Sequence, residues 1–292
     1  MELGRYGIWT SALDRQPAHA VRQAVAELDR THFSALWVGE AFRRDPFANS
    51  ALFLASSSRL VVATGIANIW ARDAQAMRAG QLTLAEAFPE RFLLGLGVSH
   101  VPLVNTRGHR YARPYSAMRA YLEAMDQARY ESPLPAVAPP RVLAALGPRM
   151  LELAAQRADG AHPYFVPVDH TEVARRILGA GKLLCPEQAV VLDPDPVAAR
   201  EVARRHTTTY LRLPNYRQNL ERLGFGAADF EAGGSDRLVD AIVAHGSPAQ
   251  VAGRVRQHLE AGADHVAIQV LTRDPEVVPL SEWWQLDREL LG

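Results

Sequence analysis

In "RLVVATGIANIWARDAQAMRAGQLTLAEAFPERFLLGLGV" (residues 59–98), two short apolar runs flank a longer segment with a helical pattern. The runs at 59–66 and 91–98 are continuously apolar rather than alternating. Continuous runs are typical of parallel strands whose two faces are covered by helices. The segment at 73–89 between them predicts a helix, so this stretch predicts one strand–helix–strand unit.

The same unit recurs along the whole chain, which predicts a (β/α)8 barrel formed by residues 1–292 as a single domain. An open doubly wound sheet is the alternative. Residues 194–246 exceed one helix, so extra helices are expected between strands seven and eight, and 99–113 is expected to be a rim loop. The expected strands cover 3–10, 35–40, 59–66, 91–98, 141–147, 160–166, 187–193 and 264–271, and the expected helices cover 17–31, 47–58, 73–89, 114–130, 148–158, 168–178, 247–262 and 280–291.

Composition excludes several classes of function. The chain is 48% hydrophobic and carries 32 basic and 32 acidic residues, so no basic field favours nucleic acid. Its start, "MELGRYGIWT", lacks a signal-peptide pattern, and no apolar run reaches the ~18 residues of a membrane span. We therefore expect a cytoplasmic protein with no membrane partner. Cys185 is the only cysteine and no paired-histidine motif occurs, so no disulfide within the chain and no metal site are expected.

Two glycine turns could lie next to a ligand. Gly95-x-Gly97 would begin a dinucleotide fingerprint, but the third glycine position holds His100 and no helix signal follows at once, so that motif is rejected. These glycines either let the backbone approach a ligand or permit tight packing. Gly147 and Pro148 stand between a strand and a helix, where unpaired backbone amides could bind phosphate, although an ordinary turn has the same pattern.

Three polar residues stand on or beside expected strands. Glu40 ends strand two, and carboxylates at that end of barrel strands often bind or react with a ligand. His162 and Tyr164 lie on strand six, where a structural role is the alternative. Asn68 is a polar residue where "VVATGIANIW" (61–70) would accept another apolar one, so we expect this strand end to hold a ligand.

The chain resembles the bacterial luciferase-like superfamily, and within it the oxidoreductases that use the deazaflavin coenzyme F420. The resemblance extends over nearly the whole sequence and depends on the order and spacing of several stretches rather than on one motif. These stretches are "VATGIANIW" (62–70), "AFPERFLLGLGVSH" (87–100), "ALGPRMLELAAQRADGAHPY" (145–164) and "GSPAQVAGRVRQHLEAGADHVAIQVL" (246–271).

The resemblance implies a cofactor site at the ends of strands three to six. In this family a non-proline cis peptide in a bulge backs the central ring of the deazaflavin, and the matching bond is Gly65–Ile66, with the small Ala67 beside it. Backbone along the phosphate-bearing tail would come from the next three turns. The matching residues are Gly97, Val98 and Ser99 after strand four, Leu146, Gly147 and Pro148 after strand five, and Gly160, Ala161 and Tyr164 at strand six.

The resemblance also implies an activity, namely hydride transfer between F420 and an unidentified small organic substrate. Glu40, His100 and His162 are the proton-transfer candidates. Relatives that oxidise a sugar phosphate have a histidine after the strand-two acid, where this chain has Ala41, so that substrate is disfavoured. The alternatives are a monooxygenase that uses flavin mononucleotide (FMN) and a non-catalytic ligand-binding barrel. Arg72, Arg107 and Arg110 could neutralise a phosphate, and a homodimer is one possible assembly.

Overall fold

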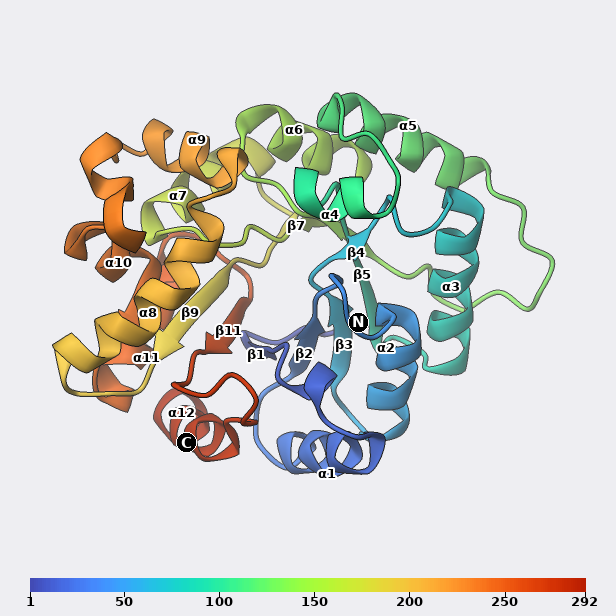
Figure 1. Ribbon diagram of the computed structural model, residues 1–292. Coiled ribbons are helices and arrows are strands. Elements are labelled where there is room, and N and C mark those ends of the chain that lie inside the picture. Colours follow the sequence, from blue (N-terminus) through green and yellow to red (C-terminus); the bar gives the residue numbers. More distant parts are fainter.

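The computed structural model describes residues 1–292 and contains one curved, wholly parallel sheet surrounded by helices (Figure 1). All eight strands expected from the sequence are present, so the barrel prediction is confirmed. They are β1 (Tyr6–Trp9), β2 (Ala35–Val38), β3 (Val61–Thr64), β5 (Phe92–Gly97), β6 (Arg141–Leu143), β7 (Gly160–Ala161), β9 (Glu187–Val191) and β11 (Val266–Val270).

The sheet closes through its seventh strand. The two-residue β8 (Leu183–Leu184) pairs with β7 and leads directly into β9, which pairs with β11, and β11 pairs with β1. Between β8 and β9 the chain still follows β7, because the amide of Cys185 donates to the carbonyl of Ala161 over 2.9 Å. The closed parallel ladder is that of a (β/α)8 barrel.

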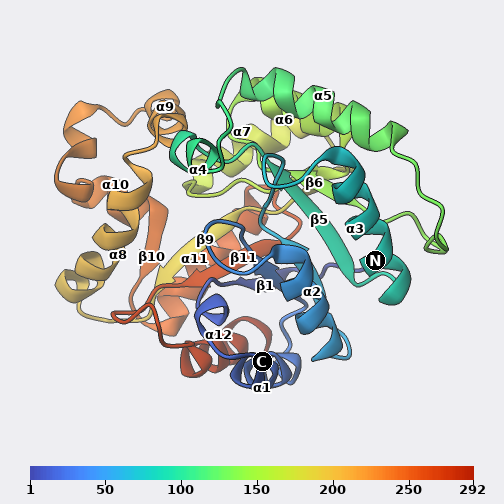
Figure 2. The ribbon, with the colours of Figure 1, turned by 45° about the vertical axis from the view of Figure 1, so that its right-hand side comes forward.

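Helices cover the outer face of the barrel, each after its strand (Figure 2). Their starts follow ordinary capping chemistry: in the helix before the last barrel strand, Ser247 and Gln250 form a reciprocal capping box and Pro248 occupies the first turn. The helices are α1 (Ala18–Asp29), α2 (Pro46–Ala55), α3 (Ala74–Ala87), α5 (Pro114–Gln127), α6 (Pro148–Arg157), α7 (Val168–Leu178), α11 (Pro248–Glu260) and α12 (Leu280–Leu291).

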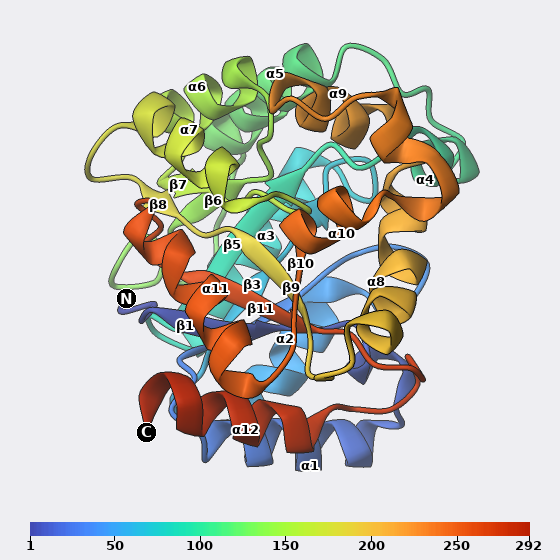
Figure 3. The ribbon, with the colours of Figure 1, turned by 90° about the vertical axis from the view of Figure 1, so that its left-hand side faces the viewer.

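The insertion between the seventh and eighth barrel strands is helical, as expected, and stands on one side of the barrel (Figures 1 and 3). It comprises α8 (Pro196–Tyr210), α9 (Pro214–Arg222), the 3-10 segment η2 (Ala227–Gly233) and α10 (Asp236–Ile242). It ends in a strand that was not expected, β10 (Val243–His245), which pairs with β9. Also unexpected are β4 (Ala67–Asn68), β8, α4 (Val101–Thr106) and the 3-10 turn η1 (Leu13–Arg15).

The barrel interior is filled by side chains, with an indole at its centre. The Trp37 ring is fully buried and stacks on His162 with a centroid distance of 4.4 Å. Its Nε1–H donates to Nε2 of His265 over 3.0 Å, and Nδ1–H of His265 donates to the carbonyl of Gly4. The polar atoms of this central layer are therefore largely satisfied inside the protein, which gives the strand ends above it a rigid base.

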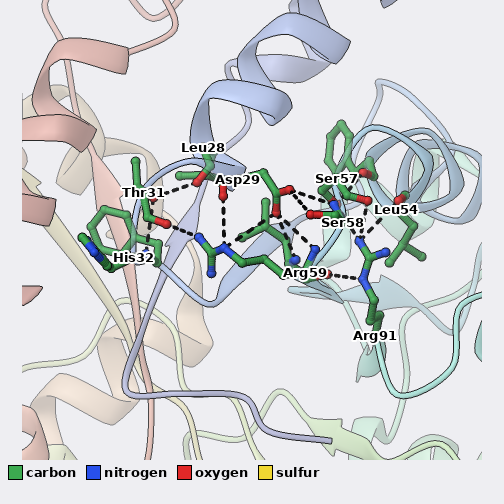
Figure 4. A network of polar contacts seen from close by, with 12 residues as sticks. Leu28, Asp29, Thr31, His32, Leu54, Ser57, Ser58, Arg59 and Arg91 are labelled. Atoms are coloured by element: carbon green, nitrogen blue, oxygen red, sulfur yellow. Dashed lines mark hydrogen bonds and ion pairs between the residues drawn. The ribbon is translucent and has the colours of Figure 1, made fainter.

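At the amino-terminal ends of the strands, a polar network ties the turns together (Figure 4). The Asp29 carboxylate accepts from the amide and hydroxyl of Ser58, both over 2.8 Å, and Nε of Arg59 donates to the Asp29 carbonyl over 3.0 Å. Arg91 donates to the carbonyl of Leu60 and, over 2.6 Å, to the hydroxyl of Ser57. These bonds fix the approach of the chain to β2, β3 and β5.

No helix in the structure combines the length and the apolar character needed to cross a bilayer.

Candidate active site

A cavity of about 700 Å³ opens at the carboxyl ends of the strands, where barrel enzymes carry their sites. The barrel turns form most of its wall, and residues 209–222 of the insertion close one side. Helix α9 approaches the start of α4 there, since the His100 ring at the start of α4 is 5.4 Å from that of Tyr216 on α9 (Figure 2). The volume suits a flat organic cofactor with room for a small second ligand.

The bulge after β3 forms part of the cavity wall. The Gly65–Ile66 peptide bond is cis, as expected from the sequence. A side chain at Gly97 would approach the Ile66 Cδ1 to 2.4 Å, and one at Gly95 would approach the Thr64 carbonyl oxygen to 1.9 Å. The two β5 glycines are therefore required by the packing of the bulge onto β5, and Ile66 fills the space that Gly97 leaves.

Gly65 lies between two aromatic side chains of the barrel. Its carbonyl accepts from Nε1–H of Trp9 over 3.0 Å, and a Cβ at this position would stand 2.7 Å from that nitrogen and 2.9 Å from Nε2 of His162. Glycine is thus the residue that lets the bulge sit this close to the barrel interior.

His162 does not have the environment of a proton-transfer group. Its Nδ1–H donates to the Cys185 carbonyl over 2.6 Å, because a carbonyl can only accept. Burial lowers the pKa of His162 to about 4, so the ring is neutral at pH 7. The other nitrogen, Nε2, is sealed from solvent and has no partner. The side chain lines the cavity and supports the wall at Gly65, and neither ring nitrogen is exposed to solvent.

Glu40, the second proton-transfer candidate, is engaged by other groups of the protein. Its carboxylate is 5% exposed and receives both terminal nitrogens of Arg72, each over 2.8 Å, and the amide of Asn68 over 2.7 Å. Both carboxylate oxygens are thus already bonded, by the bidentate guanidinium and the backbone amide, so neither is left free for a ligand. Glu40 therefore anchors the bulge through Asn68, whose side chain in turn accepts from the amide of Trp70.

The turns after β5 and β6 present backbone amides that donate to no acceptor in the protein. These are the amides of Ser99 and His100 in one turn and of Leu146 and Gly147 in the other. Ser99 has a left-handed φ of 57°, and its buried hydroxyl is also without a partner. Free amides at the cavity wall, with α6 starting at Gly147, form a concave donor set that favours an anion.

Arg222 adds a cation to this donor set. It lies at the end of α9 and lines the cavity, and its Nη1 would be 3.5 Å from a Cβ placed on Gly147. None of the three arginines considered from the sequence lines the cavity, Arg110 included. Arg72 binds Glu40 and Asp45, and Arg107 donates to the carbonyl of Ala41. The insertion, rather than the rim loops, thus brings an arginine to the amide turns.

A layer of tyrosines joins the insertion to the barrel. The Tyr164 hydroxyl donates to Oε1 of Gln269 over 2.7 Å and lies 2.9 Å from the hydroxyl of Tyr210. Beneath them, burial raises the pKa of Glu187 to about 8, and this carboxyl receives one bond, from the amide of Phe165 over 3.1 Å. The charge of Glu187 in turn contributes to the raised pKa of both tyrosines, after burial itself.

One carboxyl in the cavity wall was not predicted. Asp14, in the η1 turn after β1, lines the cavity, and its Oδ1 accepts from the Asn49 side chain over 2.7 Å. Burial raises the pKa of Asp14 to about 6 against the opposing effect of Arg43, Asn49 and Arg44. Sequence reasoning selected an acid at the end of strand two, and the same rule applied to the turn after strand one would have found Asp14.

Most of the residues predicted for the site meet around this one cavity. Ala67, Pro148, Gly160 and Ala161 do not line it. Ala67 and Ala161 are buried in the core around the strands, and a side chain at Gly160 would approach the Leu183 carbonyl oxygen to 1.9 Å, so strand packing requires this glycine. Those that line the cavity are Glu40, Gly65, Ile66, Gly97, Val98, Ser99, His100, Leu146, Gly147, His162 and Tyr164.

The sequence matches one family model and several curated proteins. A family model described as luciferase-like monooxygenase matches residues 4–265. A provisionally named coenzyme F420-dependent oxidoreductase of Mycobacterium tuberculosis is 27% identical over 197 residues, which are 56% of each chain, so the match spans about half the length of that relative. An uncharacterised protein of Mycobacterium bovis is 26% identical over 310 residues, covering 87% of this chain and 91% of the relative.

Solved structures share the fold at low sequence identity. An F420-dependent secondary alcohol dehydrogenase with an F420–acetone adduct has a TM-score of 0.75 at 13% identity, covering 96% and 99% of the two chains. The F420-dependent tetrahydromethanopterin reductase of Methanopyrus kandleri scores 0.72 at 17% identity, covering 99% of both. The oxygenating component of 3,6-diketocamphane monooxygenase from Pseudomonas putida, with FMN, scores 0.71 at 14%, covering 98% and 96%.

Proposed function

Because the chain belongs to the luciferase-like monooxygenase family, we propose that it is an oxidoreductase that transfers a hydride between coenzyme F420 and a small organic substrate. One observation carries the proposal: two turns with unpaired amides, an arginine and the Gly65–Ile66 bulge all line the same cavity. This arrangement offers an anion seat beside a flat wall, which is what a phosphate-bearing ring cofactor needs.

The residues present fit the anionic part of such a cofactor. The amides of Ser99, Leu146 and Gly147 would donate to phosphate oxygens, and Arg222 would neutralise part of the charge. The unpaired buried hydroxyl of Ser99 is satisfied only if something outside the protein's own atoms bonds to it.

The ring would lie against the bulge. Ile66 presents an apolar side chain that is fixed on Gly97, and Trp9 holds the Gly65 carbonyl in place. When bound, the cofactor supplies or accepts the hydride, and the chain's own residues hold the ring, exclude water and move a proton. All three proton-transfer candidates in the sequence line the cavity, but Glu40 is ion-paired and Nε2 of His162 is buried, which leaves His100.

The choice of F420 over FMN is supported by the name of the Mycobacterium tuberculosis relative and by two of the similar structures. FMN is the second candidate, since a similar fold binds it in the diketocamphane enzyme. Both cofactors carry a phosphate and a tricyclic ring, so the anion seat and the bulge suit either. A direct measurement of affinity separates them.

The test is equilibrium binding of oxidised F420 and of FMN to the same sample, followed by fluorescence. We expect F420 to bind at least tenfold more tightly, a difference of about 1.4 kcal/mol. Equal affinity or a preference for FMN would replace the proposal with the FMN-dependent monooxygenase. Binding of neither at roughly millimolar concentration, where the free energy is only about −4 kcal/mol, would indicate a non-catalytic barrel.

A further inference from the structure

Only two carboxyl groups line the cavity, Asp14 and Glu40. The Glu40 oxygens are both occupied, by Arg72 and by the amide of Asn68. Asp14 has one oxygen bonded to Asn49, whereas Oδ2 accepts no hydrogen bond and is not sealed from solvent. Asp14 is therefore the carboxyl that a ligand in the cavity can reach.

The surroundings of Asp14 fix its orientation. Asn49 is 2% exposed and lies on α2, so the bond from its amide to Oδ1 holds the carboxyl in one rotamer. The loop that carries Asp14 is tied to the next loop, because Arg43 donates to the Ser11 carbonyl over 3.1 Å and Arg44 to the Gln16 carbonyl over 2.7 Å. A group held this way presents the same oxygen to each ligand.

The charged groups that face Asp14 are Arg43 and Arg44 on the neighbouring loop, and both favour its ionised form. Desolvation outweighs them and raises the pKa to about 6. An acid is most effective in proton transfer when its pKa lies near the working pH. The other titratable candidates differ: burial lowers the pKa of His100, and burial raises the pKa of Tyr164 well above 10.

We propose that Asp14 is the residue that exchanges a proton with the substrate, through Oδ2, in the reaction of the proposed function, on which this inference rests. In the reducing direction the two electrons arrive with the hydride from the cofactor and form the new C–H bond. The proton leaves Oδ2 and forms the new O–H or second C–H bond, so substrate and carboxylate exchange no net electrons. In the oxidising direction the Asp14 carboxylate accepts the proton.

The first experiment uses the protein without cofactor. Carboxyl carbon NMR of protein labelled at aspartate, with Asp14→Asn to identify the resonance, should show Asp14 titrating near 6. Asn49→Ala removes a donor that stabilises the carboxylate, so the Asp14 pKa should rise further. Titration near the ordinary value of 3.8 would overturn the inference whether or not F420 binds.

The second experiment measures single-turnover reduction of 2-cyclohexen-1-one by protein loaded with reduced F420. We expect Asp14→Asn to bind F420 with unchanged affinity and to react roughly 10²-fold more slowly. The wild-type rate should fall as the pH rises through about 6, because the acid form is lost, and this limb should vanish in Asp14→Asn and return in Asp14→Glu. The exposed Glu201→Gln is the matched acid-to-amide control and should behave as wild type.

The outcomes separate the two proposals. If F420 binds and turns over the enone equally well with Asp14→Asn, Asp14 has no such role and the proposed function stands. If F420 does not bind, or binds without reducing any enone, the proposed function is contradicted, and the NMR titration alone still decides whether Asp14 holds an exchangeable proton near pH 6.

Discussion

The two ends of the barrel treat polar groups in opposite ways. At the amino-terminal end, Asp29 accepts from Ser58 and Arg59, and Arg91 donates to the Ser57 carbonyl, so these charged groups are bonded to the nearby turns (Figure 4). At the carboxyl end, the amides of Ser99 and Gly147 donate to nothing in the protein. The first arrangement stabilises the fold, and the second leaves donors for a ligand.

The difference teaches which residues to regard as functional. A charged residue whose oxygens are both bonded within the protein, such as Glu40, contributes to structure even when it lies next to the cavity. A group with a free, oriented atom, such as Oδ2 of Asp14, is available for chemistry. Substitutions at the two ends should therefore separate stability from binding.

The largest effect is expected at the amino-terminal end. Asp29→Ala leaves the amide and hydroxyl of Ser58 and the amide of Arg59 without their acceptor, so the free energy of unfolding should fall by about 3 kcal/mol. Urea denaturation measures the loss, and F420 affinity should not change while the protein is folded. Glu27→Ala, on the same helix in an exposed pair with Arg30, is the control and should cost at most about 0.5 kcal/mol.

The lowered pKa of Asp29 predicts that the folded protein loses stability in acid. Burial alone would raise its pKa, but the bonds from Ser58 and Arg59 outweigh burial and lower it. The stabilisation is therefore present above the ordinary pKa and is lost as the pH falls through the lowered value. Asp29→Ala should lack this acid-side loss; equal acid sensitivity in both proteins would mean that the network does not act through Asp29.

The stability contributed by Glu187, whose charge acts on Tyr164 and Tyr210, should have the opposite pH dependence. Burial raises its pKa to about 8, so the folded state binds a proton that the unfolded state has released above about 4.5. Stability should fall as the pH rises from about 5 to 8, by roughly 2 kcal/mol or more. Glu187→Gln keeps an acceptor for Phe165 and should abolish this slope in urea denaturation. A variant with the wild-type slope would show that Glu187 is ionised in the folded protein.

Arg222→Ala tests whether the open end binds an anion. Loss of the guanidinium beside Gly147 should weaken F420 binding about 20-fold, or ~1.8 kcal/mol, and should change the free energy of unfolding by less than about 0.5 kcal/mol. The control is Arg217→Ala on the same helix, since that side chain lies over the Phe230 ring and does not line the cavity. If both variants lose the same F420 affinity, the loss comes from a disturbed helix α9 and not from a missing phosphate contact.

The smallest effect is expected at Gly147 itself. Its φ of −83° and ψ of 157° suit any residue, so Gly147→Val should fold normally. The branched side chain would extend toward Arg222 and cover the amide, weakening F420 binding about tenfold, or ~1.4 kcal/mol. Gly147→Ala should weaken it less. A valine variant that loses stability but binds normally would assign Gly147 to the turn alone.

The sequence predicted the barrel well because burial on both faces leaves continuous apolar runs. The helix expected at 247–262 appears as α11, with the cap at Ser247. The short strands β4, β8 and β10 were missed, because two or three residues carry no periodicity that distinguishes a strand from a turn. Residues 243–245 also follow the apolar end of α10 without a break.

The candidate site was predicted only where a local sequence pattern marks it. Turns after strands are visible in the sequence, so Gly97 and Gly147 were found, the family resemblance added Ser99, and all three line the cavity. The path of the insertion is not encoded in any local pattern, so Arg222 and Tyr210 could not be placed beside those turns.

The fit between Ile66 and Gly97 has a consequence for how the sequence can change over generations. The isoleucine occupies the volume that a side chain at position 97 would need: a Cβ placed on Gly97 would be 2.4 Å from Cδ1 of Ile66. The two positions are therefore coupled. An alanine at 97 requires the Ile66 side chain to turn away or to become smaller, so the exchange is easiest when the change at 66 comes first. Pairs that vary together at these positions among descendants of a common ancestor would record that order, and a designer who wishes to reshape this wall has to alter both residues at once.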